Sequence, residues 1–204
     1  MRRKNAGFLL VVGLVWILVV GAGLGMLQRY ENTPSLQATP GKRWPANLPF
    51  APASDKPTLV MLAHPRCPCT RASIGELARL MTRCQGKLSA KVLFFTPKGA
   101  EAQWARTDLW HSAAAIPGVE VVADAGGTLA AQHFHAATSG QTLLYDAMGR
   151  LLFCGGITEA RGHAGDNAGA GAIASLVTTG TAQQTKTAVF GCSLLSPSSP
   201  PKGP

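Results

Sequence analysis

Two cysteines separated by one residue form the segment of this chain with the clearest chemistry, His64–Cys69 (HPRCPC). The segment lies between an apolar run, which predicts a buried strand, and an amphipathic stretch, which predicts a helix. A thiol at a helix start is close to unpaired backbone N–H groups and the positive end of the helix dipole, which favour the thiolate. Thiolates attack disulfides and bind soft metal ions. We therefore predict Cys67 and Cys69 to be reactive, with Arg66 and Arg71 adding positive charge.

The short spacing of this pair has a consequence for a disulfide between its members. A disulfide needs Cα atoms about 4.4–6.8 Å apart, which residues two positions apart reach only where the chain bends. Because Pro68 restricts the bend, a Cys67–Cys69 disulfide is expected to be strained and easily given up to a substrate. We predict that Cys67, as the more exposed thiol, attacks the substrate and that Cys69 resolves the mixed disulfide.

The same residues support two other hypotheses. Cys67 and Cys69, together with His64 and a distant His163, offer sulfur and imidazole ligands to copper(I) or zinc(II). In the third hypothesis the cysteines only staple a non-catalytic interaction module.

The remaining cysteines and one polar loop allow several roles. Cys154 ends a predicted strand and Cys192 follows the last predicted helix, so the two can form a structural disulfide; alternatively, Cys192 reaches Cys69 as a distant resolving thiol. The sequence does not choose between these pairings. Residues 155–167 form a polar loop in which Arg161 and His163 are expected to line the site. His163 would exchange protons with the thiols, since imidazole titrates near neutral pH.

Hydrophobic periodicity predicts an α/β domain that positions these groups. The expected helix Thr70–Cys84 has one apolar stripe and places Glu76 on its exposed face. Strands and helices that alternate along the chain indicate a central mixed sheet with helices on both faces. The expected strands are Thr58–His64, Lys91–Thr96, Val119–Ala123, Thr142–Asp146 and Leu151–Cys154, and the other helices are Ala102–Ala115, Thr128–Ala136 and Ala168–Val177.

An N-terminal apolar segment predicts the location of the domain. Residues 6–27 contain no charged side chain, and 22 helical residues span about 33 Å, enough to cross a bilayer. The basic residues within 1–5 favour a cytoplasmic stub, which predicts a single-pass inner-membrane protein whose domain faces the periplasm. The alternative is a cleaved signal peptide. Both place the cysteines in an oxidising compartment, where disulfide chemistry operates.

The rest of the chain divides by composition. Residues 28–55 are expected to be a linker, residues 56–180 the folded domain, and residues 181–204 a C-terminal extension with a disordered end. Of the chain's net charge of +9, most lies in the tails, because residues 56–180 hold 11 basic and 8 acidic side chains. No basic cluster interleaved with aromatic residues occurs in the domain, which argues against a nucleic-acid partner.

The motifs CPCTR, TSGQTLLYD and RGHAGDNAG, together with the predicted element order, resemble the thioredoxin-like superfamily. Within it, the chain is similar to membrane-anchored periplasmic thiol–disulfide oxidoreductases of the RedB-like type. The resemblance implies an enzyme without a cofactor, which exchanges disulfides with protein partners and a membrane or periplasmic electron donor. Copper chaperones with a thioredoxin-like fold, two cysteines and a later histidine supply the alternative.

Three departures from the superfamily pattern bear on activity. The cysteine pair is C-x-C rather than C-x-x-C, and Gln141 stands where a cis proline normally faces the disulfide. His64 stands three residues before Cys67, where the peroxidase signature has threonine, which argues against a peroxidase.

Overall fold

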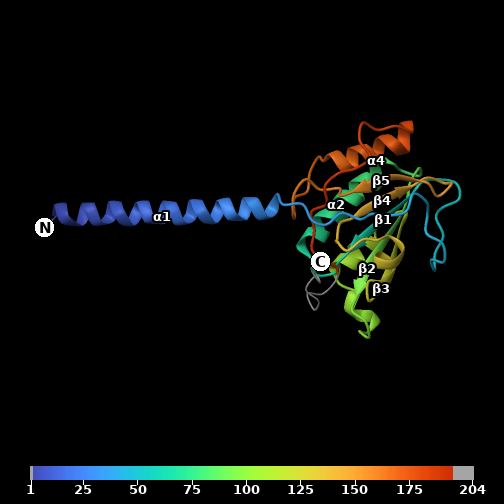
Figure 1. Cartoon of the computed structure of the whole chain (residues 1–204), viewed down its shortest axis with the longest axis horizontal. Coiled ribbons are helices and arrows are strands. Elements are labelled where there is room, and N and C mark those ends of the chain that lie inside the picture. Colours follow the sequence, from blue (N-terminus) through green and yellow to red (C-terminus); the bar gives the residue numbers. More distant parts are fainter. Residues whose placement is uncertain (1, 195–204) are drawn as a thin grey trace, which may run out of the picture. The chain divides into compact units, whose positions relative to one another are not determined.

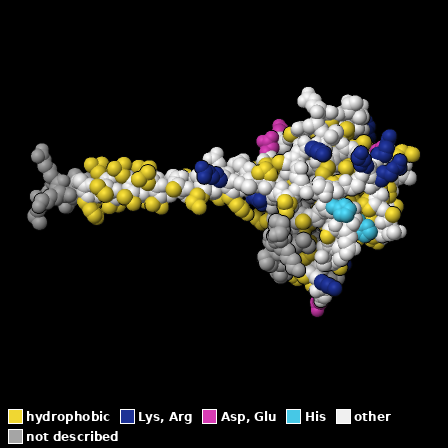
Figure 2. All heavy atoms as spheres, viewed as in Figure 1, with side chains coloured by type: hydrophobic (Ala, Val, Ile, Leu, Met, Phe, Trp, Pro, Cys, Tyr) yellow, Lys and Arg dark blue, Asp and Glu magenta, His cyan; other side chains and the backbone are white. Residues whose placement is uncertain are grey.

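The computed structural model describes residues 2–194, apart from the side chains of residues 2–6 and 102. It divides into two compact units, Met1–Thr33 and Pro34–Pro204. The first unit is helix α1 (Arg2–Glu31). Its segment Gly7–Glu31 is long and apolar enough to cross a membrane, and its hydrophobic side chains are exposed along the helix (Figure 2). The predicted apolar helix is thus confirmed, and it is consistent with either a signal or an anchor.

The second unit is built on a five-stranded mixed sheet with the order β3-β2-β1-β4-β5 (Figure 1). Strands β1, β2 and β3 are parallel, β4 is antiparallel to β1, and β5 completes an antiparallel hairpin with β4. The α/β class and mixed sheet predicted from periodicity are confirmed. The strands are β1 (Thr58–Ala63), β2 (Ser89–Thr96), β3 (Val119–Ala125), β4 (Thr142–Tyr145) and β5 (Leu151–Gly155).

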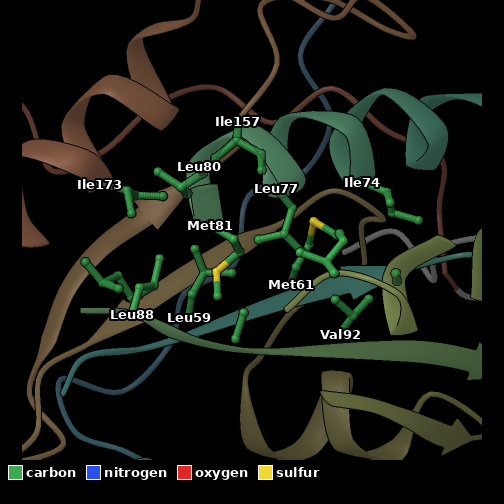
Figure 3. Close-up of a cluster of buried hydrophobic side chains, with 14 of the residues drawn as sticks. Leu59, Met61, Ile74, Leu77, Leu80, Met81, Leu88, Val92, Ile157 and Ile173 are labelled. Atoms are coloured by element: carbon green, nitrogen blue, oxygen red, sulfur yellow. The ribbon is translucent and has the colours of Figure 1, made fainter. Parts of the chain in front are cut away.

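Both faces of the central strand are buried, which explains why β1 is apolar throughout. Successive side chains of a strand point to opposite faces. Accordingly, Leu59 and Met61 lie in one hydrophobic cluster, whereas Val60 and Leu62 lie in another. Figure 3 shows how helix α2 closes the first cluster: its apolar side chains, Ile74, Leu77, Leu80 and Met81, pack with Leu59, Met61 and Val92 of the sheet.

Helix α2 (Pro68–Arg83) begins within the cysteine motif. Pro68 occupies the first turn, where its missing N–H costs nothing and its fixed φ suits a helix. The expected exposure of Glu76 is wrong, because this side chain is buried. Its carboxylate accepts hydrogen bonds from the Gly165 N–H at 2.8 Å and the Arg79 guanidinium at 2.6 Å. Glu76 therefore ties α2 to the polar loop 155–167.

The other helices are shorter or more irregular than predicted, except α4 (Ala168–Thr179), where Asn167 caps the Ala170 N–H. The expected helix 102–115 is two elements, the 3-10 turn η1 (Ala102–Ala105) and α3 (Asp108–Ala114). The expected helix 128–136 is a π-helical turn, η2 (Leu129–His133). Here the buried Asp124 carboxylate accepts the N–H groups of residues 129 and 130, at 2.8 and 2.9 Å, so a side chain of β3 sets the turn.

Residues 34–55, expected as a linker, pack along the domain. The Ala38 N–H donates to Gln141 Oε1 at 2.8 Å, and the Trp44 N–H donates to the Gly149 carbonyl at 2.7 Å. The Trp44 ring meets the Tyr145 ring edge-on, with centroids 5.1 Å apart. This segment therefore adds to the hydrophobic cluster on the face of the sheet opposite α2.

The segment after α4 also returns to the domain (red in Figure 1). It runs beside β5, where the Cys154 N–H donates to the Thr185 carbonyl at 3.0 Å, and buries Val189 completely. We call residues 181–194 the C-terminal arm. The end of the predicted extension 181–204, which was expected to be disordered, lies outside the described residues.

Candidate functional site

The two cysteines of the motif lie at the start of α2, as predicted. Cys67 is the N-cap residue, with extended backbone, and Cys69 lies in the first turn. Both are buried: Cys67 is 3% exposed and Cys69 is 7% exposed, so the prediction that Cys67 is the more exposed is wrong. Neither belongs to a hydrophobic cluster of the domain. The groups that act on their sulfur atoms are other thiols, backbone N–H groups and Arg161.

A third cysteine completes the site. The sulfur atoms of Cys67, Cys69 and Cys192 all lie within 4.8 Å of one another. We call these residues the thiol cluster. The predicted Cys154–Cys192 disulfide is not formed, since all five cysteines are free thiols. Cys154 has other neighbours: its sulfur lies 3.7 Å from the Ala38 carbonyl oxygen and 3.5 Å from Gln141 Nε2. Of the two roles that the sequence leaves open for Cys192, the geometry favours the one beside Cys69.

The C-terminal arm holds Cys192 over the start of α2 by backbone pairing. The Ser139 N–H donates to the Cys192 carbonyl at 2.9 Å, and the Leu194 N–H donates to the Ala137 carbonyl at 2.7 Å. The backbones of these two segments lie so close together that a Cβ atom on Gly191 would lie 1.8 Å from the Ser139 carbonyl oxygen. Only glycine fits there without a shift of backbone. Arg161 adds hydrogen bonds to the Gly191 carbonyl and to Ser35 Oγ.

The chain before β4 supplies a hydroxyl group that sequence reasoning missed, that of Ser139. Ser139 Oγ accepts the His64 N–H at 3.0 Å and lies 2.7 Å from Thr70 Oγ1. Gln141, which was expected near the thiols, points elsewhere: its amide binds Ala38 and the Cys154 region. The only sequence signal for Ser139 was its place in the TSGQ segment, two residues before the position of the superfamily's proline. The described residues contain no cis peptide bond.

Hydrogen bonding favours the thiolate of Cys67. Burial alone would raise the pKa of this thiol. The Cys192 side chain, together with backbone N–H groups of Thr70, Cys69 and Cys192, stabilises the anion and leaves the pKa lower than that of an ordinary thiol. The sequence argument from the helix start is supported, whereas the arginines do not rank among the main influences.

The other two members of the cluster ionise less readily than an ordinary thiol. The pKa of Cys69 is raised by burial and by the neighbouring charge of Cys67. The pKa of Cys192 is raised to about 12, mainly by burial and by its hydrogen bond to Cys67. Burial also raises the pKa of Cys84 and of Cys154. Cys67 is therefore the first of the five thiols to lose its proton as pH rises.

Replacement of Cys192 tests this proton order. Because Cys67 has the lowered pKa, the first thiolate of the wild-type protein should form below the pH at which an ordinary cysteine ionises. Cys192→Ala removes a donor and should move that step to higher pH, whereas Cys192→Ser keeps an O–H donor and should move it less. The thiolate ultraviolet absorbance, followed through a pH titration, measures the step. Equal titrations for the wild type and Cys192→Ala would contradict the assignment.

The charged residues of the motif have partners outside the thiol cluster. The Arg66 guanidinium lies 4.5 Å from the centre of the Trp104 ring, a cation–π contact. Arg71 forms an ion pair with Asp108 at 2.6 Å, with both side chains exposed to solvent. Arg66 and Arg71, which were expected to act on the thiols, thus interact with Trp104 and Asp108 instead.

The two histidines proposed as metal ligands do not join the sulfurs. His64 stacks on Phe95, with ring centroids 5.7 Å apart, and its Nδ1 accepts the Arg66 N–H at 3.2 Å. Burial, reinforced by the charge of Arg66, lowers the pKa of His64. His163 is exposed, and its backbone N–H donates to the Ala160 carbonyl at 3.3 Å. Among the described residues, the group with metal-ligand spacing consists of the three cysteines alone.

The strand order, the antiparallel β4–β5 hairpin and the helix that follows β1 make a thioredoxin-like fold, and this fold carries a three-cysteine site. The fold predicted from resemblance is therefore confirmed. No protein-family model matches the chain. No curated protein matches it either.

Two solved structures share the fold of this chain, and a third is more distantly similar. A hypothetical protein of Sinorhizobium meliloti is similar over 80% of this chain and 100% of its own, with 18% identity and a TM-score of 0.60. An uncharacterized conserved protein of Geobacillus kaustophilus covers 82% of this chain and 99% of its own, with 17% identity and a TM-score of 0.58. A secreted disulfide oxidoreductase of Mycobacterium tuberculosis covers 61% of this chain and 82% of its own, with 17% identity and a TM-score of 0.39.

Proposed function

We propose that this protein exchanges thiols and disulfides with protein partners, using Cys67 as the nucleophile. The observation that carries the proposal is the asymmetry of the thiol cluster. Cys67 has a lowered pKa, and two thiols with raised pKa values lie within 4.8 Å of its sulfur. A nucleophilic thiolate with resolving thiols beside it is the arrangement that disulfide exchange requires.

The exchange balances in two steps. The Cys67 thiolate attacks one sulfur of a substrate disulfide, so that a Cys67–substrate bond forms and the other substrate sulfur leaves as a thiolate. A second thiol of the cluster then loses its proton and attacks Cys67. The substrate is released fully reduced, and two cysteines of this protein are oxidised to a disulfide. A dithiol protein at the membrane or in the periplasm would then reduce this disulfide and so return the two electrons. In the reverse direction, the same steps oxidise a substrate.

Two thiols are placed to perform the second step. From the sequence, Cys69 is expected to be the resolving thiol. However, a disulfide between Cys67 and Cys69 would span only one intervening residue, Pro68. Cys192 belongs to a separate segment and donates a hydrogen bond to Cys67. Peptide mapping of the oxidised protein identifies the resolving thiol, and a bond from Cys67 to Cys84 or Cys154 would contradict both choices.

The apolar helix α1 bears on where in the cell this reaction would take place. We propose that α1 anchors the protein in the inner membrane as a single pass with the domain in the periplasm. The reasons are the basic residues before Gly7 and the length of the apolar segment Gly7–Glu31. An oxidising compartment would supply disulfides to exchange.

An insulin-reduction assay with dithiothreitol as electron donor tests the function. The full-length protein in detergent should accelerate the reduction of insulin disulfides above the rate of the donor alone. A rate equal to that of the donor alone would overturn the proposal and favour the non-catalytic interaction module. A Cys84→Ala variant serves as the matched control, because Cys84 is a buried core thiol outside the cluster.

A further inference from the structure

We infer that Cys67, Cys69 and Cys192 together form a three-coordinate thiolate site for copper(I). This inference goes beyond disulfide exchange and replaces the histidine ligands, expected from the sequence, with the cysteine of the C-terminal arm. The proposal stands on the position of the three sulfur atoms, which all lie within 4.8 Å of one another.

The distances between the sulfurs suit a shared ion. A thiolate sulfur binds a closed-shell metal ion such as zinc at about 2.3 Å, and at that bond length a trigonal site places its sulfurs about 4 Å apart. The thiol cluster therefore needs to contract by less than an ångström around an ion at its centre. Two ligands come from the first turn of α2 and the third from the arm, so the ion would join two segments.

The chemistry of the ligands selects the ion. Soft thiolates favour copper(I), whereas structural zinc almost always takes four ligands in a tetrahedron. Within the part of the chain that the structure describes, no histidine, aspartate or glutamate joins the three sulfurs as a fourth ligand. Burial of Cys67 and Cys69 also limits access of water to a vacant position.

The start of α2 stabilises the negative charge that copper(I) binding creates. Each of the three thiols releases its proton when the ion enters, because the thiolate is the ligand. Three thiolates and one copper(I) ion carry a net charge of −2. The N-terminal end of α2 stabilises negative charge here.

The arm is held in position before any ion binds. The Cys192 carbonyl accepts the Ser139 N–H, and Gly191 packs against the Ser139 carbonyl, so Cys192 does not have to be recruited from solvent. A disulfide between any two members of the cluster would remove ligands. Copper binding is therefore expected only in the reduced protein.

An anaerobic titration with copper(I) tests the inference. The reduced full-length protein in detergent competes with bicinchoninate, a copper(I) chelator, and should bind one ion. Cys192→Ser should weaken binding by about tenfold or more, which corresponds to about 1.4 kcal/mol. Cys84→Ala should bind as the wild type does, because its sulfur lies in the hydrophobic core.

X-ray absorption of the copper-loaded wild-type protein gives a measurement that needs no variant. Three sulfur neighbours are expected around copper, and two in Cys192→Ser. Two sulfur neighbours in the wild type, unchanged affinity in Cys192→Ser, or zinc(II) bound in preference to copper(I) would each overturn the inference. The insulin-reduction assay contains no copper, so activity there without copper binding would defeat this inference and leave the proposed function standing.

Discussion

Cys67→Ser is expected to lower the rate of insulin reduction by about 100-fold or more, to the rate of the dithiothreitol donor alone. Cys67 is the one thiol of the five whose pKa is lowered, and the Cys192 thiol donates a hydrogen bond to it. A serine hydroxyl does not ionise near neutral pH, so it cannot attack a disulfide sulfur. The initial rate with the full-length variant, set against the wild type, measures the loss.

The other cysteine variants make this result specific. Cys69→Ser and Cys192→Ser keep the Cys67 thiolate, so each should still form a mixed disulfide with the substrate. The variant that lacks the resolving thiol should accumulate that species, which is visible by mass spectrometry. If Cys67→Ser kept its activity while one of these variants lost it, the nucleophile would have been assigned to the wrong sulfur.

Gly191→Ala is expected to displace the C-terminal arm from the site. A Cβ atom at this position would lie 1.8 Å from the Ser139 carbonyl oxygen, so backbone must move. The cost is about 1–3 kcal/mol of unfolding free energy, as for other overpacked sites. As the arm moves, Cys67 should gain exposure from its present 3% and lose the hydrogen bonds from Cys192. The reduced variant should therefore react faster with maleimide at Cys67, which peptide mass spectrometry quantifies.

Gly171→Ala provides the matched control for Gly191→Ala. Gly171 lies in α4, and a Cβ there would have no atom within 4 Å. Alanine is the better helix former by about 1 kcal/mol, so the control should be as stable as the wild type or more so. Its labelling at Cys67 should be unchanged. Wild-type labelling and stability in Gly191→Ala would show that the arm does not cover the thiols.

The covering arm also bears on how a protein substrate would react. With Cys67 almost wholly buried, a bulky disulfide reaches its sulfur only after a local movement of the surrounding chain. The arm is held by hydrogen bonds, by close packing at Gly191 and by the buried Val189 and Leu194. Helix α2 places more side chains, such as Leu77, in the hydrophobic core. We therefore expect the arm, rather than the helix, to give way.

The local pattern of apolar and polar residues determined much of the fold. The apolar run at 58–63 predicted β1, because a strand covered on both faces has no polar side. The stripe of residues along α2 predicted its buried face, and the start of this helix placed Cys67 where backbone N–H groups favour a thiolate. These features depend on residues close together in the chain, so periodicity and helix-terminus chemistry were sufficient.

The predictions that depended on contacts between residues distant in the sequence were less accurate. Glu76 was expected in solvent, yet the loop at Gly165 returns to bind its carboxylate. Helix α3 is shorter than its sequence indicated. Its capping residue Thr107 donates its hydroxyl to the Pro65 carbonyl at 2.9 Å, a tertiary contact at the edge of the cysteine motif.

The sequence alone determined that a pair of cysteines begins a helix after a buried strand, since strand, helix and proline signals are all local. Only the tertiary structure decided that Cys192 joins them and that Cys154, His64 and His163 do not. That choice depends on the path of the C-terminal arm past Ser139, where backbone hydrogen bonds and the absence of a side chain on Gly191 allow close approach. Backbone pairing between remote segments leaves little trace in the pattern of either segment, which is why cysteine connectivity could not be deduced beforehand.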